Sequence, residues 1–357
     1  MKIALVHDQL TQYGGAERVL DVLHDMFPEA PIYTTVYLKD KLPKFYNDYD
    51  IRTTFIDKLP IIRNKHKFRA PFFPFGIQSL NLKDYDLIIS DTQGIAKGVK
   101  LKKNQKHISY VHTIPWFIWG LKESKGRKFS QFIGKKWDYK TAQNPNILLA
   151  NSQTTHDRIL KYYNRESKVV YPPVEIQKLR SFAVEEIPDK YKDILKKPYF
   201  IFIGRLEGYK GELDFAQACT NLNQNLVIIG KGTNENKLKT FSKYVILIND
   251  ADDRVKAILL KNAQALFNGS IEDFGINMVE ALSLGVPVIA LKKGGALEIV
   301  KDGLTGVLYN EQDTESIWQT INFFIQKRFD KNKLMESSER FSREIFEQNI
   351  KEIIKSL

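Results

Sequence analysis

The 357-residue chain has little cysteine and no long hydrophobic run. Its single cysteine, Cys219, has no partner for a disulfide within the chain, and no spaced group of cysteines and histidines suggests structural zinc. The first apolar stretch ends at His7, too short for the core of a secretion signal. No later run approaches the roughly 18 apolar residues of a membrane-spanning helix. We therefore expect a cytoplasmic protein that is neither exported by this route nor threaded through a membrane.

The sequence also lacks the three spaced glycines of a dinucleotide-binding turn and the Lys-Ser/Thr ending of a Walker loop. Their absence disfavours a dinucleotide-dependent oxidoreductase. Instead, Gly14 and Gly15 separate a strand-like run, residues 2–8, from a helical pattern that begins at Ala16. The open N–H groups of such a helix start suit a phosphate, although an ordinary tight turn has the same pattern.

Acidic residues are outnumbered by basic ones, but only in the first half of the chain. The net charge is +12; residues 1–180 hold 30 lysines and arginines against 17 acidic residues, and residues 181–357 hold 24 against 25. Such a charge favours a polyanionic partner, either nucleic acid or an anionic membrane. No recognisable nucleic-acid-binding module accompanies it, so we expect no nucleic-acid partner.

The basic residues of the first half lie beside aromatic residues. Residues 63–69 are followed by Phe72, Phe73 and Phe75, and the basic stretch 122–140 also contains aromatic residues. Cations beside aromatics suit an anionic lipid surface, at about 1 kcal/mol for each basic residue near it. We therefore expect peripheral association with the inner face of the cell membrane. A solvated face above buried aromatic residues is the alternative.

Length and pattern predict two α/β domains, because the chain is roughly two to three times as long as a typical domain. Apolar runs alternate with stretches long enough for helices. These runs are 2–8, 86–90, 107–111, 147–150, 199–203, 226–229, 265–267 and 286–290. We predict two Rossmann-like, doubly wound domains, 1–180 and 181–340, that face each other across a cleft. Residues 341–357 form an amphipathic helix, which we expect to pack back on the first domain.

Two basic residues follow the first strand of the second domain. Arg205 and Lys210 lie in the turn 204–211, where their side chains can stabilise the charge that develops as a nucleoside diphosphate leaves. A solvated loop with two surface cations is the alternative. Asp250 and Asp252 have the Asp-x-Asp spacing of a divalent-metal site beneath a diphosphate. Because Arg205 and Lys210 already supply positive charge, we expect neither a metal nor another cofactor.

Two glutamates lie at a further helix start, Glu272 just before it and Glu280 two turns within it. Eight helical positions rise about 12 Å, so the two carboxylates cannot share a proton or a metal ion. They can contact different parts of one long ligand, such as a sugar nucleotide with its phosphates over the helix start. A carboxylate favoured by the helix dipole and one exposed glutamate are the alternative.

Together these motifs resemble the retaining glycosyltransferases of the GT-B fold, in the large family numbered 4. The resemblance runs through nearly the whole chain. The motifs that carry it, in the family's order, are 14–18, 204–206 with 210–211, 272–275 with 280–281, 285–290 and 294–295.

The resemblance implies two groups of site residues. Those of the second domain would bind the donor: Glu272 at the transferred sugar, Glu280 at the ribose, Arg205 and Lys210 at the diphosphate, and the backbone N–H groups of Phe274, Gly275 and Ile276. Those of the first domain would be Gly14 and Gly15 at the phosphates and His112 near the reacting sugar. Taken alone, His112 is an ordinary strand-end histidine. Glu272, His112, Arg205 and Lys210 would be the catalytic residues.

The residues 14–18, 171–174 and 294–298 look most like those of bacterial mannosyltransferases that build O-antigen and other surface polysaccharides from GDP-mannose. The resemblance implies retaining transfer of a hexose to a lipid-linked or oligosaccharide acceptor in lipopolysaccharide O-antigen, capsule or exopolysaccharide biosynthesis. The first domain would carry the acceptor. A UDP-sugar donor is one alternative, since Lys231 and the short region 244–256 depart from the family pattern near the expected base. A noncatalytic scaffold that binds the sugar nucleotide is another.

Overall fold

The computed structural model describes residues 1–59, 63, 70–120 and 128–357, and the chain divides into two compact units. Unit 1 comprises Met1–Pro173 and Phe346–Leu357, and unit 2 comprises Val174–Ile345. Each unit contains one sheet in which every described strand pair is parallel. The predicted fold class, two Rossmann-like α/β domains, is confirmed.

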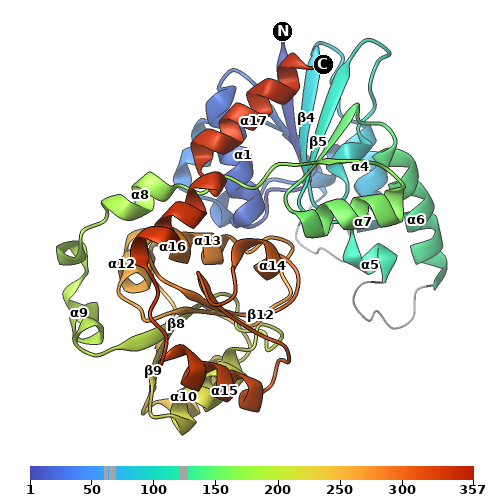
Figure 1. Cartoon of the computed structure of the whole chain (residues 1–357). Helices are drawn as coiled ribbons and strands as arrows, with labels where there is room; N and C mark the ends of the chain where they lie inside the picture. The colour runs from blue at the N-terminus through green and yellow to red at the C-terminus, as the bar shows by residue number, and fades with distance from the viewer. Residues whose placement is uncertain (60–62, 64–69, 121–127) are drawn as a thin grey trace. The chain divides into compact units, whose positions relative to one another are not determined.

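Unit 1 is built on a seven-stranded sheet in the order β3-β2-β1-β4-β5-β6-β7 (Figure 1). Its strands are β1 (Ile3–His7), β2 (Ile32–Thr34), β3 (Ile51–Thr53), β4 (Leu87–Thr92), β5 (Lys106–Val111), β6 (Ile147–Ala150) and β7 (Lys168–Val169). Its longer helices are α1 (Gly15–Met26), α4 (Phe73–Gln78), α6 (Lys128–Ala142) and α7 (Gln153–Tyr163), and α5 (Trp116–Trp119) is one turn.

Helices cover both faces of this sheet because successive strand residues point to opposite sides. Leu5 of β1 packs with Leu20 and Leu23 of α1 on one face. Its neighbours Ala4 and Val6 pack on the other face. Strands buried on both sides read as unbroken apolar runs, which is why the sequence revealed β1, β4, β5 and β6.

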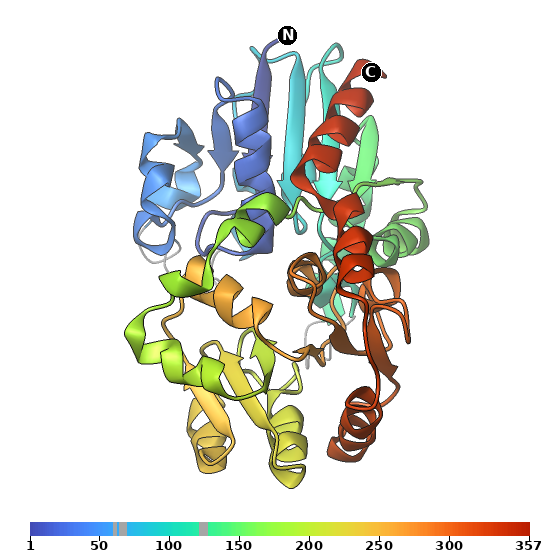
Figure 2. The same cartoon turned by 60° about the vertical axis from the view of Figure 1, so that its left-hand side comes forward.

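The C-terminal helix α17 (Arg343–Lys355) lies on the same face of the sheet as α1. Phe346, Ile350 and Ile353 enter the cluster that contains Leu5 and Leu20. Figure 2 shows this helix, in red, lying along the strands of unit 1. The last residues of the chain therefore complete the core of the unit that begins with its first residues.

Unit 2 contains a six-stranded sheet in the order β10-β9-β8-β11-β12-β13. The strands are β8 (Tyr199–Ile203), β9 (Asn225–Ile229), β10 (Val245–Ile248), β11 (Leu266–Asn268), β12 (Val288–Leu291) and β13 (Gly306–Tyr309). The helices are α8 (Ile176–Ser181), α9 (Asp189–Lys192), α10 (Glu212–Asn221), α11 (Glu235–Leu238), α12 (Asp253–Lys261), α13 (Ile276–Ser283), α14 (Ala296–Ile299), α15 (Thr314–Phe324) and α16 (Lys331–Ser338).

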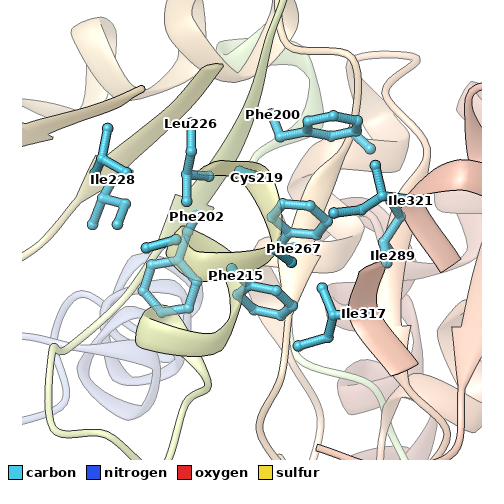
Figure 3. Packing of buried hydrophobic residues seen from close by; sticks show 14 of the residues in the cluster. Phe200, Phe202, Phe215, Cys219, Leu226, Ile228, Phe267, Ile289, Ile317 and Ile321 are labelled. Carbon is cyan, nitrogen blue, oxygen red and sulfur yellow. The ribbon is translucent and has the colours of Figure 1, made fainter. Parts of the chain in front are cut away.

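Aromatic side chains fill one face of the unit 2 sheet (Figure 3). The ring of Phe267 stacks on Phe215 of α10 at 4.4 Å and on Phe200 at 5.0 Å between centroids. Cys219 packs in the same cluster, where burial raises the pKa of its thiol above the usual value. Each fully buried phenylalanine contributes about 1.5–3 kcal/mol. This packing fixes α10, and with it the loop that precedes this helix.

The sequence analysis did not predict several short strands. The strands β2, β3, β7 and β13 have two to four residues, and each includes a polar residue or a glycine, which weakens the apolar pattern. Residues 64–69 and much of the basic stretch 122–140 lie outside the described residues. Among the helices that the structure describes, none is long and apolar enough to cross a membrane.

Candidate active site

In unit 2, the loop after β8 brings Lys210 to Glu272. The Lys210 ammonium lies 2.7 Å from Glu272 Oε1, although the two residues are 62 positions apart in sequence. The same carboxylate oxygen accepts a hydrogen bond from Ser270 Oγ at 2.9 Å. Both side chains are partly exposed, at 16% and 26%. The pair is therefore ordered, yet open to a ligand.

Arg205 leaves the same loop near its start and is exposed. Its guanidinium forms no hydrogen bond or ion pair with any residue that the structure describes. A guanidinium offers five N–H donors in a planar fork that matches phosphate oxygens. Arg205 is thus a cation available for an anionic ligand at the carboxyl end of β8.

Buried hydrogen bonds to Glu212 fix the shape of the loop between β8 and α10. Gly208, at a φ of +81°, donates its N–H to Glu212 Oε1 at 2.6 Å, and Asn234 Nδ2 donates to the same oxygen at 2.8 Å. Glu212 is fully buried at the first position of α10. The sequence analysis missed Glu212; a carboxylate in the first turn of a helix was the available signal.

Two glycines support the segment that carries Glu272. Gly295 donates its N–H to the Glu272 carbonyl at 2.9 Å. A Cβ added at Gly295 would lie 1.9 Å from the Phe274 carbonyl oxygen, and one at Gly294 would lie 2.5 Å from the Glu272 carbonyl oxygen. The Gly294-Gly295 motif is therefore required for close backbone packing against residues 272–274.

Helix α13 begins directly after this segment, with Gly275 at a φ of +102°. The backbone N–H groups of Gly275 and Ile276 donate to no other residue in the described ranges. Open N–H groups at a helix start favour an anion. Gly275 also lies close to Glu272, because a Cβ built on it would be 3.7 Å from Glu272 Oε2.

Glu280 is the fifth residue of α13, so it lies about one turn into this helix and not two turns, as the sequence suggested. Its side chain is almost fully buried and forms an ion pair with Lys256 of α12, Nζ to Oε2, at 2.9 Å. A buried carboxylate needs such a partner, because removing it from water is costly. Any ligand hydroxyl that reaches Glu280 would share it with Lys256.

The Asp-x-Asp residues have other partners. Asp250 accepts hydrogen bonds from Lys190 and from the Tyr191 hydroxyl, each at 2.8 Å. Asp252 is the N-cap of α12 and accepts the Val255 N–H at 2.8 Å. Both contacts stabilise local structure in unit 2.

In unit 1, the glycine pair opens α1 as predicted. Gly15 is the first residue of the helix, and the N–H of Gly14 donates to Glu17 Oε2 at 2.8 Å. Glu17 is buried, and its other oxygen lies 3.6 Å from His7 Nε2. The glycine turn is thereby connected to the end of β1.

His112, just after β5, is part of a buried charged row. Its Nε2 lies 2.5 Å from Asp91 Oδ1, and Asp91 Oδ2 lies 2.8 Å from His7 Nδ1. Burial lowers the pKa of His7, but the carboxylates of Asp91 and Glu17 outweigh burial and raise it to about 10. Burial also raises the pKa of Asp91, while His112 and His7 more than compensate and hold it below its usual value.

The sequence analysis selected His112 but missed His7, Asp91 and Glu17 as its neighbours. His7, Asp91 and His112 stand at the carboxyl ends of β1, β4 and β5, which are adjacent in the sheet. Ligands of open parallel sheets bind beyond these ends. A polar residue at the end of each apolar run was the signal.

Two Rossmann-like units, each with polar and charged residues at the carboxyl ends of its strands, are the arrangement of the GT-B fold. The crystal structure of Anabaena HepE in complex with UDP-glucose has this fold: the TM-score is 0.74, the identity is 20%, and all of both chains is covered.

Family models identify the sequence in the same way. The model described as Glycosyltransferase Family 4 matches residues 13–178, and the model described as Glycosyl transferases group 1 matches residues 183–347. The chain therefore belongs to the glycosyltransferases of this family, as its motifs indicated.

Two relatives match over most of their length. An uncharacterized glycosyltransferase of Methanocaldococcus jannaschii is 24% identical over 365 residues, which cover 93% of this chain and 91% of the relative. The O-antigen chain mannosyltransferase C of Escherichia coli is 22% identical over 356 residues, covering 94% and 91%.

Proposed function

We propose that this glycosyltransferase moves a hexose, with mannose from GDP-mannose as first choice, from a nucleotide sugar to a lipid-linked or oligosaccharide acceptor, with retention at the anomeric carbon. The pathway would be that of a bacterial lipopolysaccharide O-antigen, capsule or exopolysaccharide. The family assignment supports nucleotide-sugar chemistry, and the Escherichia coli relative supports mannose.

One observation carries the proposal: Lys210 is held 2.7 Å from Glu272 beside the open helix start of α13. A diphosphate over that helix start would meet the Lys210 ammonium, the Arg205 guanidinium and the N–H groups of Gly275 and Ile276. The negative charge that develops on the leaving phosphate would be stabilised there. Lys210 would then share its charge between the diphosphate and Glu272. The Glu272 carboxylate would accept hydrogen bonds from hydroxyl groups of the transferred sugar.

The chemistry requires no second carboxylate as nucleophile. The bond between the anomeric carbon and the departing phosphate breaks while the acceptor oxygen bonds to the same carbon. The phosphate oxygen takes the proton of the acceptor hydroxyl. His112 would contact the reacting sugar, and Gly14 and Gly15 would lie at the phosphates. No metal ion or other cofactor takes part in this proposal.

A UDP-sugar donor is the main alternative. It is supported by HepE, whose crystal structure contains UDP-glucose, whereas the Escherichia coli relative is a mannosyltransferase. Either donor would use Lys210, Arg205 and Glu272 in the same way, because these residues would contact the diphosphate and the sugar, not the base.

Thermal unfolding with GDP, UDP, ADP and TDP, each alone and as its sugar conjugate, tests the donor without an acceptor. A ligand at 100 times its Kd stabilises the protein by about 2.7 kcal/mol. We expect GDP-mannose to stabilise the wild type, and Lys210→Ala to lose the effect. Lys237→Ala, an exposed lysine on α11 of the same unit, is the matched control and should keep it. A response to UDP-sugars alone would replace GDP-mannose as the donor, and no response to any nucleotide would contradict a nucleotide-sugar donor.

We also propose that unit 1 associates with anionic lipid, where a lipid-linked acceptor would be found. Phe75 of α4 is 68% exposed and Phe132 of α6 is 54% exposed. The Lys136 ammonium lies 4.4 Å from the centroid of the Phe132 ring. An exposed aromatic ring beside a cation suits the interface between lipid headgroups and acyl chains.

Flotation with anionic and neutral vesicles tests this association. The double variant Phe132→Ser/Lys136→Ser should float less with anionic vesicles than the wild type. Unit 2 offers a matched control, because Lys327 lies 4.5 Å from the exposed ring of Phe323. Phe323→Ser/Lys327→Ser should float like the wild type. Equal indifference of the wild type to both vesicles would exclude the membrane proposal.

A further inference from the structure

Four ionisable side chains form one buried row in unit 1: Glu17, His7, Asp91 and His112. None is more than 10% exposed. The row follows from the sheet order, because His7 of β1 stands in register with Asp91 of β4, and the backbone N–H of His112 donates to the carbonyl of Thr92. Buried charges persist only where they are paired. The positions of the protons on the two histidines therefore decide how the charges of the row are balanced.

Both ring nitrogens of His7 face carboxylate oxygens. Nδ1 lies 2.8 Å from Asp91 Oδ2, and Nε2 lies 3.6 Å from Glu17 Oε1. Ionised carboxylates only accept hydrogen bonds, so Nδ1 must carry a proton, and the nearby Glu17 carboxylate favours a proton on Nε2 as well. His7 is therefore an imidazolium at neutral pH, which agrees with its raised pKa. Its charge offsets that of Asp91 and holds that carboxylate in one orientation.

The second oxygen of Asp91 is then committed to His112. Oδ1 lies 2.5 Å from His112 Nε2 and can only accept from it. The proton of a neutral His112 must accordingly be on Nε2, and Nδ1 is the nitrogen left for a ligand. Without a fixed acceptor, the proton could occupy either nitrogen.

We propose that His7 and Asp91 are positioning residues that hold His112 as the Nε2-protonated tautomer, with Nδ1 presented to the substrate. The role toward substrate rests on the proposed glycosyl transfer. Glu17 completes the device, because it pairs with His7 through one oxygen and accepts the Gly14 N–H through the other. The glycine turn and the His112 ring are thus connected by one row of contacts, which consists of hydrogen bonds and the ion pair between Glu17 and His7.

Ring-nitrogen NMR of ¹⁵N-histidine-labelled wild-type protein tests the tautomer directly, without a substrate. His112→Gln and His7→Gln assign the two signals among the six histidines. In the neutral form of His112 we expect a protonated Nε2 and an unprotonated Nδ1, and at pH 7 we expect two protonated nitrogens for His7. A His112 proton on Nδ1, or averaging over both nitrogens, would overturn the proposal.

Asp91→Asn tests the consequence for turnover. The amide can direct its N–H at His112 and favour the other tautomer, so kcat should fall by about 10²–10⁴-fold while donor affinity stays unchanged. His107→Gln is the matched control: His107 is fully buried in β5 of the same sheet, but it contacts Ser90 Oγ at 2.8 Å and lies outside the row. It should keep wild-type kcat.

A wild-type kcat in Asp91→Asn, or equal losses in both variants, would show that the row has only a structural role. If Asp91→Asn does not fold, the ring-nitrogen spectrum of the wild type decides alone, and a neutral His112 with its proton on Nδ1 counts against the row. Failure of glycosyl transfer itself would appear as a wild type that neither binds nor consumes nucleotide sugars, whatever its histidine spectrum.

Discussion

Removal of the Asp138 carboxylate should strongly destabilise unit 1. Asp138 Oδ1 lies 2.5 Å from the Lys97 ammonium, and the two side chains are 0% and 1% exposed. Oδ2 accepts hydrogen bonds from Trp119 Nε1 at 2.7 Å and from the Tyr163 hydroxyl at 2.8 Å. Asp138→Ala therefore leaves three donors without their acceptor: the buried Lys97 ammonium, the buried Tyr163 hydroxyl and the partly buried Trp119 N–H.

The expected loss follows from these contacts. Removing one partner of a buried ion pair costs about 3–5 kcal/mol, because the remaining charge stays uncompensated. A domain of this size is stable by about 5–15 kcal/mol, so the loss is a large fraction of the stability of unit 1. Lys97→Met combined with Asp138→Ala should regain at least about 1 kcal/mol, since no charge is then left buried.

Urea unfolding followed by tryptophan fluorescence measures this loss. Three of the four tryptophans lie in unit 1, and Trp318 lies in unit 2. In a Trp318→Phe background the signal reports on unit 1 alone. Asp50→Ala, which breaks an exposed pair with Arg52, is the control and should cost about 0.2–1 kcal/mol. A loss below about 1 kcal/mol in Asp138→Ala would refute the reasoning, because Lys97 would then be accommodated without its partner.

The remaining predictions concern backbone packing and pH. Gly295→Ala should lower stability by about 1–3 kcal/mol and weaken nucleotide binding, since its Cβ would displace the Phe274 carbonyl; thermal unfolding with and without nucleotide measures both. Gly303→Ala, with no atom within 4 Å and a φ of +75°, should cost about 1 kcal/mol and leave binding unchanged; equal binding in both variants would contradict the packing argument. The pKa of His7 is raised to about 10 on folding, so its contribution to stability is complete below about pH 6.5 and is lost as the pH rises through 10. In pH-dependent urea titrations, His7→Gln should flatten that slope by up to about 1.4 kcal/mol per pH unit, and an unchanged slope would show that His7 does not bind the extra proton.

The sequence by itself determined the fold class and the identity of the main polar residues. Runs such as Tyr199–Ile203 are apolar throughout because a parallel strand covered on both faces has no solvent side. The turns after such strands must carry the ligand chemistry, so Arg205, Lys210 and His112 could be selected from their positions and from the family resemblance. Short strands that include polar residues, such as β2 (Ile32–Thr34), lack a clear apolar run and could not be found in this way.

The partners of these residues were decided only by the tertiary structure. Lys210 meets Glu272, and Glu280 meets Lys256, because strands and helices distant in sequence pack side by side. His7, Asp91 and His112 form one row because β1, β4 and β5 are neighbours in the sheet, an order that no local periodicity encodes. These contacts also raise the pKa of His7 and lower that of Asp91, since each charge removed from water needs a partner of opposite charge close to it.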